Sequence, residues 1–161
     1  KIKVTNINPD HIMPVLNKLE ETNCKLNIEK NSIELLAPKR LEAVNIKTLP
    51  YPGFPTDMQS IFVAMLTTAK GTSVVEENIF ENRYKYVQEL SRMGAKITVS
   101  GKTAIIDGTK RIYGANVKAT DLRGGMALVV EALVAKRITQ IENIHFILRG
   151  YENLEKKLTN L

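Results

Sequence analysis

The stretches SIFVAMLTTA (residues 60–69) and MALVVEALVA (residues 126–135) decide the fold. Each is apolar on nearly every side when drawn as a helix, whereas a helix at a protein surface carries a single apolar stripe. At 10 residues, each is much shorter than the roughly 20 residues that a membrane-spanning helix needs. We therefore expect both to be helices buried inside the protein, with strands outside them.

Both stretches belong to an internal repeat, in which segments recur after 64, 66 or 71 residues. The matched pairs are KLNI (25–28) with KITV (96–99), NIK (45–47) with NVK (116–118), Thr56-Asp57 with Thr120-Asp121, and Ala69-Lys70 with Ala135-Lys136. Units of this length that mix strands and helices predict an α/β fold with threefold pseudosymmetry. The expected architecture is an inside-out α/β barrel domain of βαβαββ repeats with buried helices, and residues 1–161 are expected to form a single domain.

Strands and helices are expected to alternate along the whole chain, because runs with alternating polarity are interleaved with runs at helical spacing. The expected strands are 2–5, 25–29, 32–37, 43–47, 72–77, 95–100, 103–108, 115–119 and 138–142. The expected helices are 9–22, 56–69, 83–93, 121–135 and a terminal helix that Arg149 opens.

Composition narrows the class of protein. The net charge is +6, but the basic residues are scattered, aromatic residues make up only 6%, and there is no Trp. Nucleic-acid binders usually concentrate their charge in one stripe, so we expect phosphate-bearing small molecules as partners and no nucleic acid. No apolar run is long enough to span a membrane, and the single cysteine fits a reducing compartment. We expect a cytoplasmic protein with no membrane partner.

The segment PYPGFPTDMQ (50–59) precedes the first buried helix and contains a Pro-rich insertion that the second repeat lacks. Two interpretations of it are open. Thr56 could cap the helix, with Asp57 in its first turn at the positive end of the helix dipole. Alternatively, a rigid loop could hold Asp57 at hydrogen-bond distance from a substrate hydroxyl, as a general base.

Three arginines stand at expected helix starts: Arg83 in FENRY, Arg123 in DLRGG and Arg149 in LRGYE. Together with free backbone N–H groups, they could converge on one end of the domain and bind phosphate or carboxylate. The alternative for each is a solvated surface arginine.

Cys24 is not expected to be a nucleophile, because the 71-residue shift places it on Ala95 and so indicates a small buried packing residue. His11 and His145 have no Cys or His at metal-ligand spacing, and no Gly-rich phosphate loop is present. The sequence therefore predicts no metal and no cofactor.

The motifs PGFPTDMQ, FENR…ELSRMGA, ATDLRGG and RGYE occur here in one order. As a set they resemble the C-terminal portion of the UDP-N-acetylglucosamine 1-carboxyvinyltransferases, within the enolpyruvyl transferase family. The resemblance covers essentially the whole chain. It implies transfer of the enolpyruvyl group of phosphoenolpyruvate to the 3-hydroxyl of UDP-N-acetylglucosamine, with release of phosphate. That reaction begins peptidoglycan synthesis and so implies roles in cell wall biogenesis, cell shape, cell division and the cell cycle.

The resemblance also implies roles for individual residues. Asp57 matches the carboxylate that contacts the sugar hydroxyl, which makes it the candidate general base. Arg123 and Arg149 match catalytic arginines at the phosphoenolpyruvate end, with the carboxylate of Asp121 nearby. The remaining implied substrate-binding residues are Thr56, Ile79, Phe80 and Arg83.

The family has two inside-out domains that close over the substrates, and its reactive-loop cysteine lies in the domain that has no match here. The chain begins at Lys1 without a methionine and ends in LEKKLTNL, partway through a repeat. We therefore expect a fragment that lacks the first strand and the whole second domain and is inactive without that N-terminal catalytic domain. Two alternatives stay open: a 5-enolpyruvylshikimate-3-phosphate synthase-like transferase, and a non-catalytic binding paralogue.

Overall fold

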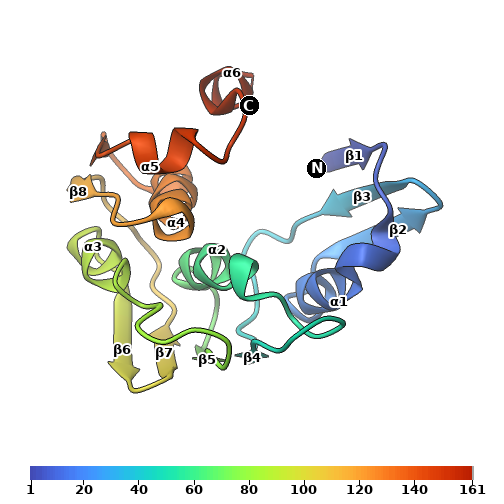
Figure 1. Ribbon diagram of the computed structural model, residues 1–161, viewed down its shortest axis with the longest axis horizontal. Coiled ribbons are helices and arrows are strands. Elements are labelled where there is room, and N and C mark those ends of the chain that lie inside the picture. The colour runs from blue at the N-terminus through green and yellow to red at the C-terminus, as the bar shows by residue number, and fades with distance from the viewer. Residues whose placement is uncertain (161) are drawn as a thin grey trace.

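The computed structural model describes residues 1–160 and shows three small sheets arranged around helices (Figure 1). In chain order the elements are β1 (Ile2–Thr5), η1 (Pro9–Ile12), α1 (Met13–Glu21), β2 (Lys25–Glu29), β3 (Ser32–Leu36), β4 (Ile46–Lys47), α2 (Thr56–Leu66), β5 (Thr72–Glu76), α3 (Val87–Arg92), β6 (Lys96–Ser100), β7 (Thr103–Asp107), β8 (Asn116–Lys118), α4 (Leu122–Val134), β9 (Gln140–Glu142), α5 (His145–Leu148) and α6 (Leu154–Thr159). No helix formed by these 160 residues is long and apolar enough to cross a membrane.

The two smaller sheets each match a part of the four-stranded sheet, as the predicted repeat requires: β1-β3-β2 matches β5-β7-β6, and β8-β9 matches β4-β5. The strand orders of the three sheets are β1-β3-β2, β4-β5-β7-β6 and β8-β9, with β4–β5 and β8–β9 parallel and the remaining pairs antiparallel. The segment β4-α2-β5-α3-β6-β7 is one complete βαβαββ unit. The hairpins β2–β3 and β6–β7 have the same register under the 71-residue shift, since Ile28 faces Ile33 in one and Val99 faces Ala104 in the other.

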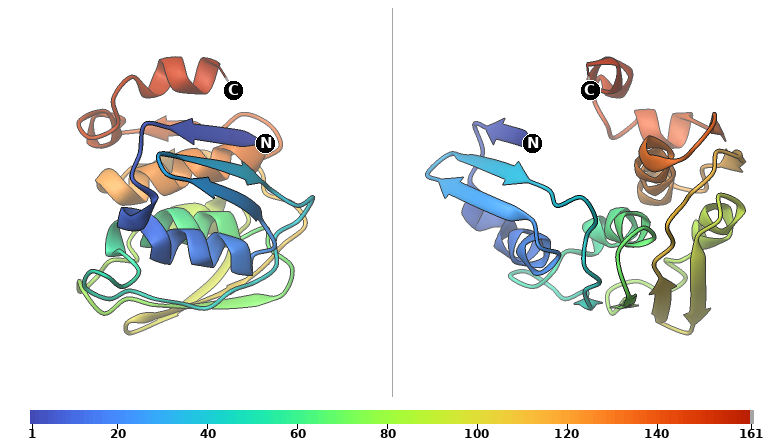
Figure 2. Two further views of the ribbon diagram at one scale, coloured as in Figure 1. Left: turned by 90° about the vertical axis from the view of Figure 1, so that its right-hand side faces the viewer. Right: turned by 180° about the vertical axis from the view of Figure 1, so that it is seen from behind.

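The helices α2 and α4 form the centre of the core, as their all-round apolar sequences predict. Val63 and Leu66 on α2 and Ala127 and Leu128 on α4 are fully buried. Figures 1 and 2 show α2 and α4 side by side toward the middle of the molecule, with strands at its periphery. Helices inside and sheets outside are the predicted inside-out α/β arrangement, and this prediction is confirmed.

Two helix predictions need correction. The helix expected over 83–93 is limited to α3, because residues 81–86 form bends and turns that lead into it. The expected terminal helix is divided into α5 and α6, and Arg149 follows the last residue of α5 instead of opening a helix. Asn153 before α6 has a left-handed backbone (φ 52°), which separates the two helices.

Candidate functional site

The Pro-rich loop before α2 is anchored to the core. Phe54 is buried and meets Phe62 of α2 edge to face, with ring centroids 5.0 Å apart. The loop turns tightly at Gly53, whose N–H donates to the carbonyl of Pro50 at 2.7 Å. A Cβ atom at Gly53 would lie 2.4 Å from the Cβ of Leu49, so only glycine fits this turn. The anchored loop delivers the chain to the first turn of α2 in a fixed position.

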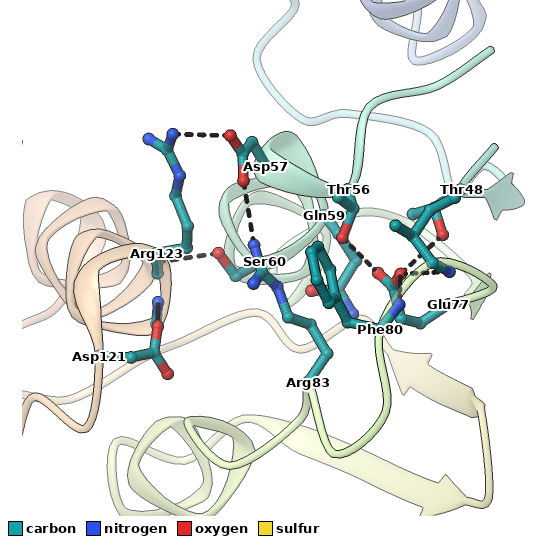
Figure 3. Close-up of polar contacts among 12 residues, drawn as sticks. Thr48, Thr56, Asp57, Gln59, Ser60, Glu77, Phe80, Arg83, Asp121 and Arg123 are labelled. Carbon is teal, nitrogen blue, oxygen red and sulfur yellow. Dashed lines mark hydrogen bonds and ion pairs between the residues drawn. The ribbon is translucent and has the colours of Figure 1, made fainter. Parts of the chain in front are cut away.

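Asp57 lies in that first turn and is held between two arginines (Figure 3). Its Oδ1 accepts a hydrogen bond from Arg83 at 3.1 Å, and its Oδ2 accepts one from Arg123 at 2.7 Å. The side chain of Asp57 is 55% exposed, while those of Arg83 and Arg123 are 22% and 29% exposed. The structure therefore brings together three of the predicted site residues from three separate segments, with the carboxylate open to solvent.

Arg123 is further fixed by its own surroundings. Its guanidinium donates to the hydroxyl of Tyr151 at 3.1 Å, and its backbone carbonyl accepts from Ser60 of α2 at 2.8 Å. Partial burial acts to lower the pKa of Arg123, but the hydrogen bonds to Tyr151 and Asp57 outweigh it and raise the pKa above its usual value. Arg123 is therefore a firmly held cation beside Asp57.

Asp121 caps α4. Its Oδ1 accepts from the N–H of Gly124 at 2.7 Å, and its Oδ2 accepts from the hydroxyl of Thr120 at 3.2 Å. The expected cap at Thr56 is wrong, because the N-cap of α2 is Pro55 and Thr56 is the first helical residue. The matched Thr-Asp pairs thus stand at different positions of their two helices, and Asp57 is in the first turn without being the cap.

The sequence did not point to Glu77, whose carboxylate contacts three of the predicted site residues, Thr56, Ile79 and Phe80. Glu77 is buried, directly follows β5, and accepts hydrogen bonds from Thr48, Thr56, Ile79 and Phe80. Nothing in the sequence distinguishes Glu77 from its neighbour Glu76, the last residue of β5, whose side chain is 40% exposed. Alternation predicts only that one of the two faces inward, since successive strand residues face opposite sides of a sheet.

The predicted substrate-binding residues Ile79 and Phe80 lie at the surface, with their backbone N–H groups bound to Glu77. Ile79 is 37% exposed and Phe80 is 51% exposed. The ring of Phe80 covers the guanidinium of Arg83, with 5.0 Å between the guanidinium carbon and the ring centroid. This contact orients Arg83 toward Asp57.

Arg149 has different contacts from this group. It is exposed, and its guanidinium lies 5.6 Å from the ring centroid of Phe146. Among residues 1–160, no hydrogen bond joins Arg149 to Asp57, Arg83 or Arg123.

The arrangement suits the binding of an anionic substrate that carries a hydroxyl. Two guanidiniums can pair with phosphate or carboxylate, and an exposed carboxylate can accept a proton. Cys24 is buried and near the hydroxyl of Thr22, as expected of a packing residue. In the described part of the chain, no cluster of three or more His, Cys, Asp or Glu residues could hold a metal ion.

Comparison with known proteins places these features in context. The family model described as EPSP synthase (3-phosphoshikimate 1-carboxyvinyltransferase) matches residues 1–158. The UDP-N-acetylglucosamine 1-carboxyvinyltransferase of Thermodesulfovibrio yellowstonii is 53% identical over 152 residues, which cover 94% of this chain and 36% of that protein. The protein of the same name from Desulfofundulus thermocisternus is 49% identical over 160 residues, which cover 99% of this chain and 66% of that protein. The chain thus spans between about a third and two thirds of the length of these curated relatives.

Two solved structures share the fold. The enolpyruvyl transferase NikO from Streptomyces tendae superposes with a TM-score of 0.88 at 23% identity, over 99% of this chain and 38% of its own. An EPSP synthase from Acinetobacter baumannii superposes with a TM-score of 0.60 at 17% identity, over 80% of this chain and 31% of its own. At these identities the likeness concerns the fold alone.

Proposed function

The chain belongs to the EPSP synthase family of enolpyruvyl transferases, as its motifs predicted, and we propose that it is one part of an enzyme acting on UDP-N-acetylglucosamine. The reaction is transfer of the enolpyruvyl group of phosphoenolpyruvate to the 3-hydroxyl of the sugar, with release of phosphate. The observation that carries the proposal is the exposed carboxylate of Asp57 between the guanidiniums of Arg83 and Arg123. The names of the relatives at 49–53% identity support the choice of sugar nucleotide.

In this proposal Asp57 accepts the proton of the sugar hydroxyl. The sugar oxygen bonds to C2 of phosphoenolpyruvate while C3 takes up a proton. The bond between C2 and the phosphate oxygen then breaks while C3 loses a proton, which restores the double bond, and the released phosphate carries away the proton that Asp57 accepted. An incoming phosphate or carboxylate competes with Asp57 for Arg83 and Arg123. Binding of the anion thus frees carboxylate oxygens to face the hydroxyl, which couples substrate binding to the readiness of the base.

The remaining predicted residues take supporting roles. Arg123 and Arg149 neutralise charge at the phosphoenolpyruvate end, with Asp121 nearby. Thr56, Ile79, Phe80 and Arg83 line the side that holds the sugar nucleotide.

We propose further that turnover needs the rest of a longer polypeptide, including an N-terminal catalytic domain with a reactive-loop cysteine. The chain spans 36% of the relative from Thermodesulfovibrio yellowstonii, and Asp57 lies open on one side. We place the enzyme in the cytoplasm, at the start of peptidoglycan synthesis.

The test is phosphate release by the full-length protein with phosphoenolpyruvate and each of two acceptors. We expect release with UDP-N-acetylglucosamine and little or none with shikimate 3-phosphate. Preference for shikimate 3-phosphate would favour the second candidate function, a 5-enolpyruvylshikimate-3-phosphate synthase-like transferase. The description of the matching family model supports that candidate. No release with either acceptor would contradict both and favour a non-catalytic paralogue. The 161-residue chain alone, assayed in parallel, is expected to be inactive.

A further inference from the structure

We propose that Glu77 is a positioning residue for the reaction: its buried carboxylate fixes Asp57 and Arg83 relative to each other. This inference rests on the proposed function, because it assigns a further residue to that reaction. Figure 3 shows Glu77 beside Thr48, Thr56 and Phe80, on the side of the site away from Arg123.

Both carboxylate oxygens of Glu77 accept hydrogen bonds. Oε2 accepts from the hydroxyl of Thr56 at 2.9 Å. Oε1 accepts from the hydroxyl of Thr48 at 3.0 Å and from the N–H groups of Ile79 and Phe80 at 2.9 and 3.1 Å. All four groups can donate to it, which is the pattern that an ionised carboxylate requires. The side chain thus ties together the end of β4, the start of α2 and the loop after β5.

One of these links leads to Asp57. Thr56 is the residue directly before Asp57, and both lie in the first turn of α2. The N-cap position is Pro55, which has no side chain that could hydrogen-bond to the helix start. The hydroxyl of Thr56 is therefore turned to Glu77, and this contact sets the position of the first turn.

The other link leads to Arg83. The N–H of Phe80 donates to Glu77, and the Phe80 ring lies over the Arg83 guanidinium. Arg83 in turn reaches Oδ1 of Asp57 at 3.1 Å. Glu77 thus positions both partners of this ion pair: Asp57 through its neighbour Thr56, and Arg83 through Phe80.

The burial of Glu77 supports a geometric role. The residue is 1% exposed, and removing a carboxylate from water carries a large penalty unless donors replace the water. Within residues 1–160, no Lys or Arg forms an ion pair with it, so neutral donors alone offset that penalty. An apolar side chain would avoid the penalty but could not connect these three segments.

The test is a double-mutant cycle in the full-length enzyme, measured as kcat for phosphate release. We expect Glu77→Ala to lower kcat at least about tenfold, because small displacements of reacting groups are costly. On an Asp57→Asn background, the same change should lower kcat less than about twofold, because Glu77 acts through Asp57. If Glu77→Ala lowers kcat by the same factor in the Asp57→Asn enzyme as in the wild type, the proposal is overturned.

Three further variants make the result specific. Glu77→Gln keeps an oxygen for the three Oε1 donors and an amide that can donate to Thr56, so it should restore most of kcat. Thr56→Val removes the Oε2 contact alone. It should lower kcat in the wild type but much less in the Asp57→Asn enzyme, and it provides the test if Glu77→Ala fails to fold. Glu76→Gln is the matched control, since Glu76 contacts Lys47 at the surface at 3.3 Å. It should keep wild-type kcat.

The outcomes separate this proposal from the function on which it rests. An active wild-type enzyme whose Glu77→Ala and Thr56→Val variants keep wild-type kcat overturns the role of Glu77 alone. A wild-type protein that releases no phosphate with either acceptor overturns both.

Discussion

Asp57 and Arg123 are joined by a hydrogen bond of 2.7 Å, although 66 residues separate them in the sequence. Asp57 is in the first turn of α2, and Arg123 is in the first turn of α4. A second contact, from Ser60 to the backbone carbonyl of Arg123, joins the same two helices at 2.8 Å. The packing of the two buried helices therefore sets the geometry of the site.

Substituting Asn for Asp57 tests the general base directly. In the full-length enzyme, Asp57→Asn should lower kcat by about 10²- to 10⁴-fold, because an amide cannot accept the hydroxyl proton. KM for the sugar nucleotide should change little, since the amide keeps the shape of the side chain. Steady-state phosphate release and thermal unfolding measure the two effects.

The control for this substitution is Asp10→Asn in η1, which lies away from the site and should leave kcat unchanged. A variant Asp57→Asn that loses several degrees of Tm but keeps its rate would contradict the role of base. Such a result would leave Asp57 with a structural role in the first turn of α2.

Much of the fold could be read from the sequence, because burial leaves a periodic signal. The hairpins β2–β3 and β6–β7 repeat with one register, and their apolar residues repeat with them. The repeat also predicted that the arginines converge, and Arg83 and Arg123 do so at Asp57. Arg83 and Arg149 were wrongly placed at helix starts. Arg83 lies in the turn before α3, and Arg149 follows α5, since the single left-handed residue Asn153 separates α5 from α6.

Other features of the site left no such signal. The Thr-Asp pairs match after 64 residues, but α2 and α4 begin 66 residues apart, at Thr56 and Leu122. The same dipeptide therefore caps one helix and lies within the other. Glu76 and Glu77 are the same residue type and face opposite sides at the end of β5, so only the tertiary structure shows that Glu77 is the buried one.

Replacing Arg123 by Lys tests whether its fork of donors is needed. The guanidinium contacts Asp57 and Tyr151 at once, and a lysine ammonium has no planar fork to do this. Arg123→Lys should lower kcat/KM for phosphoenolpyruvate by at least about tenfold, the equivalent of one charge-assisted hydrogen bond. Initial rates at varied phosphoenolpyruvate measure it, with the exposed Lys110→Arg as control; equal rates for Arg123→Lys and wild type would show that charge alone suffices.

Glu131 predicts a dependence of stability on pH. It is 1% exposed between α2 and α4, and burial raises its pKa from 4.5 to about 8, against a smaller lowering by Thr67. The single proton of the Thr67 hydroxyl can go to the Ala64 carbonyl at 2.8 Å. The contact of 2.9 Å between Thr67 and Glu131 then suits a protonated carboxyl that donates.

The sign of this dependence follows from proton binding. Between pH 4.5 and about 8 the folded chain keeps a proton on Glu131 that the unfolded chain releases, so stability falls as pH rises. The loss by pH 7 is on the order of 3 kcal/mol. Glu131→Gln stays neutral and should flatten this slope in urea unfolding of the chain, whereas the exposed Glu152→Gln should not. A slope that persists in Glu131→Gln would contradict the assignment.

Arg40 stabilises the turn that follows α2. Its Nε donates to the carbonyl of Thr68 at 2.9 Å, and its Nη2 donates to that of Ala69 at 2.8 Å. A cation there also interacts favourably with the negative end of the helix dipole. Arg40→Met keeps much of the apolar stem but leaves these carbonyls unpaired, so it should lower the free energy of unfolding by roughly 2–3 kcal/mol.

Urea unfolding of the chain measures this loss, with the exposed neighbour Lys39→Met as the matched control, which should stay within about 0.5 kcal/mol of wild type. Arg40→Lys distinguishes geometry from charge. If the helix dipole alone mattered, the lysine would restore full stability, because it carries the same charge. We expect it to restore less than half, because one ammonium cannot reproduce the paired Nε and Nη2 contacts of the guanidinium.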